Sequence, residues 1–329
     1  MNYKKYAIVD LHLHLDGSLS AKAIIEVAKK ENIVLPSFNE EELNKFLRVP
    51  ENCESLNEYL ERFALPNLVL QTEQGLEICT LDLLKRLSED GLKYVEIRMA
   101  PQLSTDKGLT QEKVVEILLK TMKKAENFGI FSNLILCMMR GDNTHEKNFE
   151  TIMVAEKFLG KGVVAMDLAG AEALFPNEMF EAEFSKINEL GIPLTIHSGE
   201  AAGPESVKSA LKYKARRIGH GIHSIEDENV INELVKRNVC LEICPKSNLD
   251  TKTISKYEDL PIRDFMKKGV KVTINTDDMT VSNTTLKDEY ETLANLGFTD
   301  ENLHEFAENT IDFAFCDTKL KSYLKSFIE

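Results

Sequence analysis

Two histidines at alternate positions, His12 and His14, stand in the stretch VDLHLHLDGS of a chain that has only seven histidines. Alternate side chains of a β-strand share a face, so both imidazoles would point the same way, with Asp10 and Asp16 on that side. Two imidazoles at this spacing can hold a metal ion, and they can equally be ordinary half-buried polar residues. The pair alone leaves both interpretations open.

Further groups that could do chemistry follow later apolar runs of the sequence. They are His197 and Glu200 in TIHSGE, His220 in RIGHG, and Asp277 and Asp278 in INTDD. Each has an ordinary explanation by itself, since a histidine can be hydrogen-bonded in a core and an aspartate can cap a helix. Together they are hard to explain as packing, because buried polar groups without partners are costly. The joint pattern therefore predicts one functional site.

Short apolar runs rich in β-branched residues recur along the chain and predict strands. The eight runs span residues 6–15, 94–100, 133–139, 163–169, 193–199, 216–221, 239–245 and 272–278. Most are apolar on both faces, which is typical of parallel strands covered by helices. Amphipathic segments between them predict helices, among them 110–129, 228–239 and 261–270.

Eight such β/α units predict an α/β chain that folds as a (β/α)₈ TIM barrel, with 1–329 as a single catalytic domain. A doubly wound open sheet is the alternative, but no glycine-rich dinucleotide motif follows the first strand. The gap at about 16–90 is too long for one helix, so we expect two or three inserted helices that form a lid-like insertion. Residues 285–329 predict helices that close the barrel. In this fold the carboxyl ends of all strands meet at one rim, where the histidines and carboxylates would gather.

The composition limits the partners that the chain can have. With 40 Lys and Arg against 54 Asp and Glu, the net charge is −14, which disfavours nucleic acid and anionic membranes. The first residues show no signal-peptide pattern, and no run is long enough to span a bilayer. The six cysteines lack disulfide or zinc-finger spacing. We therefore expect a cytoplasmic protein that acts on a small molecule.

The residue types at the predicted rim favour a metal site with one Zn²⁺. Three histidines and one carboxylate suit zinc and leave a position for water. The proposed ligands are His12, His14, His197 and Asp277. A site with two metals would want a bridging group after the fourth strand, often a modified lysine, and VVAMDLAGAE contains none.

Zinc lowers the pKa of a bound water toward neutrality and so creates a nucleophile. Asp277 and His220 could orient this water or take its proton, and Glu200 could donate a proton to the substrate. The residues therefore indicate a mononuclear zinc hydrolase or deaminase, and they leave the substrate open.

The motifs HLHLDGS, MDLAGAE, TIHSGE, RIGHG and INTDD, in this order, resemble those of the adenosine deaminase family of the amidohydrolase superfamily. The resemblance covers nearly the whole chain, including the insertion and the YVEIRMAPQ strand. It implies hydrolytic deamination of adenosine, and also of 2′-deoxyadenosine, to inosine and ammonia in purine nucleotide metabolism.

The resemblance also implies a role for each matching residue. Zinc would be held by the four ligands named above, Glu200 would protonate purine N1, and His220 would position the zinc hydroxide and help to move its proton. Asp277 would share in that proton transfer. The residues implied to contact the substrate are His14, Asp16 at the ribose 5′-hydroxyl, Gly170 at purine N3, Asp278 at N7, and Leu56, Tyr59 and Phe63 over the ribose.

Some of these residues have alternative interpretations. Leu56, Tyr59, Leu60 and Phe63 stand at helical spacing, so this stripe can dock a helix on the core as well as line a cavity. The chain also departs from the family pattern at Ala171, where many members carry an acidic residue, which leaves the local hydrogen bonding uncertain.

Other substrates and a role without catalysis remain as alternatives. Family relatives act on adenine or on other 6-aminopurine nucleosides. The adenine deaminases have a glutamate in place of Asp16 and an aspartate in place of Gly219, so both positions favour a nucleoside here. A non-catalytic purine-binding protein on the same scaffold is the remote alternative, since all the ligands and the proton donor are present.

Overall fold

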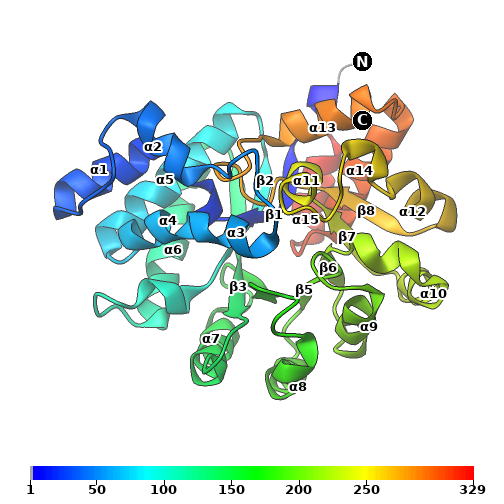
Figure 1. Cartoon of the computed structure of the whole chain (residues 1–329), viewed down its shortest axis with the longest axis horizontal. Coiled ribbons are helices and arrows are strands. Elements are labelled where there is room, and N and C mark those ends of the chain that lie inside the picture. The colour runs from blue at the N-terminus through cyan, green and yellow to red at the C-terminus, as the bar shows by residue number, and fades with distance from the viewer. Residues whose placement is uncertain (1–2) are drawn as a thin grey trace.

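The computed structural model describes residues 3–329, in which eight strands are surrounded by helices (Figure 1). Each predicted strand is present, although most are shorter than the apolar run that predicted them. The strands are β1 (Val9–His14), β2 (Tyr94–Met99), β3 (Phe131–Met139), β4 (Val163–Ala169), β5 (Thr195–Ser198), β6 (Arg217–His220), β7 (Cys240–Ile243) and β8 (Lys271–Ile274).

All neighbouring strands pair in parallel and in chain order, β1 to β4 in one four-stranded sheet and β5 to β8 in another. Isolated bridges join the two sheets at both seams, Met166 to Leu194 between β4 and β5, and Leu13 to Asp277 between β8 and β1. The ring of eight strands confirms the (β/α)₈ barrel. Within residues 3–329 its hydrogen bonding is interrupted at the seams rather than continuous.

Amphipathic helices cover the outside of the strands because each carries one apolar face. The outward side chains of β1, Leu11 and Leu13, are fully buried beneath them. Across residues 3–329, no helix is both long and apolar enough to cross a bilayer. The helices after β2 are α6 (Gln111–Ala125), α7 (His145–Phe158), α8 (Glu181–Glu189), α9 (Pro204–Lys212), α10 (Glu228–Arg237), α11 (Pro245–Asp250), α12 (Ile262–Lys268), α13 (Leu286–Asn295), α14 (Asp300–Phe313) and α15 (Thr318–Lys325).

The prediction of two or three helices between β1 and β2 is wrong, because five form there, drawn in blue shades in Figure 1. The helix that begins at Ala64 has no side-chain cap, but each of the other four begins after a side chain that accepts a hydrogen bond from its first turn. Ser20, Asn39, Ser55 and Thr72 all do this. The helices are α1 (Ala21–Glu31), α2 (Glu40–Leu47), α3 (Leu56–Leu60), α4 (Ala64–Val69) and α5 (Glu73–Glu89).

The barrel interior holds a network of fully buried ion pairs. Arg98 pairs with Asp167 (Nη1–Oδ2 2.7 Å) and with Glu242. Arg217 pairs with Glu242 (Nε–Oε1 2.5 Å) and with Glu96 (Nη2–Oε2 2.7 Å). Burial acts to raise the pKa of Glu242, but the two guanidinium groups hold it well below its usual range. Each of these charged side chains therefore has an oppositely charged partner, which a buried charge requires.

Replacing Arg217 with methionine should lower the free energy of unfolding by about 3–5 kcal/mol. The loss is expected because Glu242 and Glu96 would keep buried negative charge without this cation. Urea denaturation of the wild type and of Arg217→Met measures the difference.

The matched control is Lys212→Met, because Lys212 forms an exposed ion pair with Glu181 (Nζ–Oε1 3.2 Å). Its loss should cost less than about 1 kcal/mol. If both variants lose similarly little stability, the interior network does not stabilise the barrel.

Candidate functional site

A cavity of about 330 Å³ opens where the carboxyl ends of the strands meet the insertion. Its size lies in the range of small-molecule sites. Nearly all the residues singled out from the sequence line it: His14, Asp16, Leu56, Tyr59, Leu60, Phe63, Gly170, Ala171, His197, Glu200, His220, Asp277 and Asp278. His12, which is fully buried, lies behind this lining and reaches His197 and Asp277.

Three imidazoles and one carboxylate converge at the wall of this cavity. Nε2 of His197 lies 3.0 Å from Nε2 of His12 and 3.2 Å from Nε2 of His14. Oδ1 of Asp277 lies 3.2 Å and 3.4 Å from the same two Nε2 atoms of His12 and His14. The four donors all lie within 4.8 Å of one another, which is close enough to share one ion.

Buried carboxylates set the orientation of two of these imidazoles. Nδ1 of His12 lies 2.9 Å from Glu242, and Nδ1 of His197 lies 2.8 Å from Asp167. A neutral ring that donates through Nδ1 presents a lone pair at Nε2. Burial lowers the pKa of His14 to about 3, so this ring is neutral at pH 7. Donors of these types that converge within 4.8 Å are a chemical fit for one bound cation.

The backbone places Asp277 in an unusual conformation, with φ of 64°. Its amide donates to the carbonyl of His12 (2.8 Å), and its carbonyl accepts from the amide of His14 (2.8 Å). β8 ends at Ile274 and not at 278 as predicted, and the left-handed residue at 277 rules out a regular strand through that position. Non-glycine residues held in this way cluster at functional sites.

Glu200 is a buried carboxyl that faces the cavity. Its Oε2 lies 3.5 Å from Nε2 of His220, and its Oε1 has no hydrogen-bond partner among the described residues. Burial, with help from the charges of Asp277 and Glu172, raises the pKa of Glu200 to about 8. The carboxyl therefore carries a proton at neutral pH and can donate it to a bound molecule.

Glu172 fixes the loop that carries Glu200, a role that the sequence did not indicate. Its carboxylate accepts from the amides of Gly199, Glu200, Ala201 and Ala202 at 2.7–3.1 Å, and from the hydroxyl of Ser206. Glu172, the residue after Ala171, therefore accepts the hydrogen bonds that hold this loop.

His220 has the same left-handed backbone, with φ of 60°, and is held by Asn248 of the CPKSN segment. Nδ2 of Asn248 lies 3.0 Å from Nδ1 of His220. Because an amide nitrogen only donates, Nδ1 accepts and the ring proton is on Nε2. That proton points toward Glu200 and toward Asp277, whose Oδ2 lies 3.9 Å away.

Two glycines allow close approach at this rim. A Cβ on Gly17 would lie 1.6 Å from Oδ1 of Asp278, so only glycine fits beside this carboxyl. Gly170 has φ of 109°, and its backbone faces the cavity.

The apolar stripe on the insertion both packs and lines the cavity. Tyr59 is buried in a small apolar cluster, and Leu56 and Phe63 line the opening.

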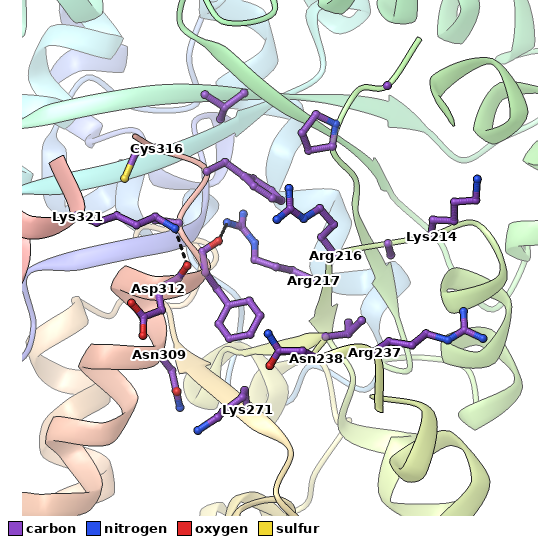
Figure 2. A pocket seen from close by; sticks show the side chains of 18 of the residues that line it. Lys214, Arg216, Arg217, Arg237, Asn238, Lys271, Asn309, Asp312, Cys316 and Lys321 are labelled. Atoms are coloured by element: carbon purple, nitrogen blue, oxygen red, sulfur yellow. Dashed lines mark hydrogen bonds between the residues drawn. The ribbon is translucent and has the colours of Figure 1, made fainter. Parts of the chain in front are cut away.

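A larger cavity of about 960 Å³ lies at the amino ends of β4 to β8, and Figure 2 shows its many cationic side chains. Two of these cations bind carbonyl groups at the negative ends of helices and so stabilise the fold. Arg237 donates to Leu211 and Arg217 donates to Phe313, both at 2.9 Å. Among residues 3–329, no histidine or glutamate lines this cavity, whereas the candidate metal ligands and Glu200 gather at the opposite rim.

The remaining histidines lie outside the group of candidate metal ligands, as expected. His145 pairs with Glu183, and His304 pairs with Glu308. His223 lines a smaller neighbouring cavity of about 340 Å³ that also includes Glu200.

Comparison with known proteins gives a consistent family. Residues 8–329 match the family model described as adenosine deaminase. An adenosine deaminase of Haemophilus ducreyi is 49% identical over 295 residues, covering 88% of this chain and 86% of that protein. An adenosine deaminase of Clostridium botulinum (strain Okra / Type B1) is 44% identical over 334 residues, covering 100% of this chain and 99% of that protein.

Solved structures share the fold. The adenine deaminase of Arthrobacter aurescens superposes with a TM-score of 0.88 at 28% identity, covering 98% of this chain and 97% of that chain. An Arabidopsis N6-mAMP deaminase superposes with a TM-score of 0.87 at 23% identity, covering 100% and 99%. The second likeness concerns the fold alone.

The four converging donors predict that the purified protein binds one metal ion per chain. Elemental analysis of the wild type and of His14→Ala should show this metal in the first and its loss in the second, because an alanine leaves three donors. His145→Ala is the control, since His145 pairs with Glu183 instead. Equal metal content in all three proteins would exclude this cluster as the binding site.

Proposed function

The chain belongs to the adenosine deaminase family, and we propose that it hydrolyses adenosine and 2′-deoxyadenosine to the 6-oxo nucleosides and ammonia, using one zinc ion. One observation carries this proposal: a buried group of three imidazoles and a carboxylate shares a cavity with the protonated carboxyl of Glu200. A metal site and a proton donor on one small cavity are what hydrolytic deamination requires.

Zinc is the ion that we propose, held by His12, His14, His197 and Asp277. Nitrogen donors and a single carboxylate suit zinc better than magnesium or calcium, which prefer oxygen ligands. The chemistry that bound zinc supplies is the activation of a water molecule at neutral pH. The rest of the reaction depends on the side chains of this chain.

Glu200 donates its proton to purine N1, which makes C6 more electrophilic. His220 donates through Nε2 to the incoming water oxygen and orients it toward C6. One water proton passes through Asp277 to the amino group, which leaves as ammonia. The other water proton replaces the one that Glu200 gave, so the enzyme returns to its starting state.

The purine and the ribose have separate partners in this proposal. Burial, together with the nearby charges of Asp277 and Asp16, raises the pKa of Asp278 well above its usual value. A protonated Asp278 can donate to N7, and the backbone of Gly170 faces N3. Asp16, at the cavity wall, accepts from the ribose 5′-hydroxyl, and His14 contributes to the same wall.

Adenine is the alternative substrate, since one of the related structures is an adenine deaminase. Two residues favour the nucleoside. Asp16 supplies an acceptor for a sugar hydroxyl. Gly219 stands where the adenine deaminases have an aspartate. A Cβ at this position would lie 2.9 Å from Cε1 of His12, so that larger side chain would press on the candidate metal ligands here.

The hydrophobic core joins residues from Tyr6 to Ile328, which supports a single catalytic domain. In this proposal the insertion covers the cavity as a lid, and the enzyme acts on its nucleoside in the cytoplasm.

Replacing Glu200 with glutamine should lower turnover by about 10²–10⁴-fold, because an amide cannot supply the proton to N1. In the wild type, turnover should fall as the pH rises past about 8, because the carboxyl then loses this proton. Ammonia release from adenosine over a pH series measures both effects.

Glu205→Gln provides the matched control, since Glu205 is exposed and lies outside this cavity. It should keep wild-type turnover. Metal content should be unchanged in both variants. Wild-type turnover in Glu200→Gln would remove the proton-donor role.

Replacing Asp16 with alanine should weaken kcat/KM for adenosine by about 10-fold, the cost of one hydrogen bond to a charged group. Adenine has no sugar, so any slow release of ammonia from adenine should be unaffected. Parallel assays with both substrates test this. An equal loss on both would show that Asp16 does not recognise the ribose, and faster wild-type turnover of adenine would favour the alternative substrate.

A further inference from the structure

The hydroxyl of Tyr59 makes a polar contact between the apolar stripe of the insertion and the predicted purine site. It donates to Oδ2 of Asp278 at 3.1 Å and lies 2.8 Å from Oγ of Ser282. Because a tyrosine hydroxyl has a single hydrogen, Ser282 must be the donor in the second bond. The three groups therefore form a directed chain from Ser282 through Tyr59 to Asp278.

The segment at 278–282, which carries Asp278 and Ser282, is hydrogen-bonded to the insertion and to the chain just after β1. Cys53, Tyr59 and Val281 form a small buried cluster of their own, apart from the main core. The amide of Val49 donates to the carbonyl of Val281 (2.9 Å). The amides of Thr280 and Val281 donate to the carbonyl of Gly17, which ties the segment after β8 to the end of β1.

The orientation of the Asp278 carboxyl depends on its hydrogen bond to Tyr59. Its Oδ1 lies 1.6 Å from the position that a Cβ on Gly17 would take, and it has no hydrogen-bond partner among the described residues. Its Oδ2 bonds to Tyr59, so the tyrosine hydroxyl sets the rotation of the carboxyl about its last bond. Both side chains line the cavity.

We propose that the Tyr59 hydroxyl is a positioning group that aims Asp278 at the N7 edge of the purine, so that α3 of the insertion contributes to base recognition. This inference rests on the proposed function, in which Asp278 meets N7. The neighbouring side chains of the stripe, Leu56, Leu60 and Phe63, can only pack. The hydroxyl of Tyr59 adds a directional contact that packing cannot replace.

Tyr59→Phe removes this hydroxyl and keeps the ring. It should raise KM for adenosine by about 3–10-fold, the effect of losing one hydrogen bond, and change kcat by less than about 3-fold. The split is expected because Asp278 contacts the base, whereas Glu200 and the metal cluster carry the reaction.

A pair of product analogues separates aiming from packing. Inosine has N7 as an acceptor, whereas 7-deazainosine has a C–H group in its place. The inhibition constant of inosine should rise in Tyr59→Phe by the same factor as KM, and that of 7-deazainosine should stay within about 2-fold. Ser282→Ala should shift the inosine constant in the same direction by a smaller factor, because the tyrosine hydroxyl loses its own donor.

Tyr94→Phe is the matched control, because the Tyr94 hydroxyl is also buried and donates to a carboxylate, Oε1 of Glu96 (2.9 Å), away from the cavity. It should leave KM and both inhibition constants unchanged. Thermal melting of each variant checks that the fold is retained.

Equal weakening of both analogues in Tyr59→Phe would overturn the proposal, because it would show that the tyrosine only packs. An unchanged inosine constant would overturn it as well. Wild-type turnover is measured in the same experiment, so an enzyme without activity on adenosine would instead refute the proposed function.

Discussion

The rest of the structure depends on the ion pairs and hydrogen bonds of one buried carboxylate, that of Glu242. Its carboxylate binds Arg98, Arg217 and Nδ1 of His12, and so joins the ion pairs of the barrel interior to the cluster of imidazoles. A carboxylate buried in this way needs its cations, and the cations need it. The orientation of a candidate metal-binding histidine is therefore part of the same electrostatic balance as the ion pairs of the barrel.

A second principle is that backbone groups hold the reactive side chains in place. Asp277 is fixed by amide and carbonyl bonds to β1, and the loop of Glu200 is fixed by the carboxylate of Glu172. Left-handed conformations at Asp277 and His220 persist because these surroundings leave no alternative. These contacts fix the side chains of the candidate site, and a fixed site lowers the cost of reorganisation during a reaction.

The sequence predicted the strands and the residues at their carboxyl ends. Strands are recognised from their local periodicity, and the barrel topology then brings their carboxyl ends to one rim. It could not predict that Glu242 and Asp167 would face His12 and His197. A charge inside an apolar strand can be seen in the sequence, but its partner on another strand cannot. The number of inserted helices was missed because capping residues such as Asn39 also occur in loops. Glu172 was missed because its partners are backbone amides.

The four candidate metal donors come from both halves of the barrel. His12 and His14 belong to the sheet of β1 to β4, whereas His197 and Asp277 belong to the sheet of β5 to β8 or directly follow it. The backbone ladder between these sheets is reduced to isolated bridges at both seams. A cation held by all four donors would act as a cross-link between two half-barrels. Neither half could form the site alone, so activity would appear only after the halves have docked, and an improperly closed chain would be inert.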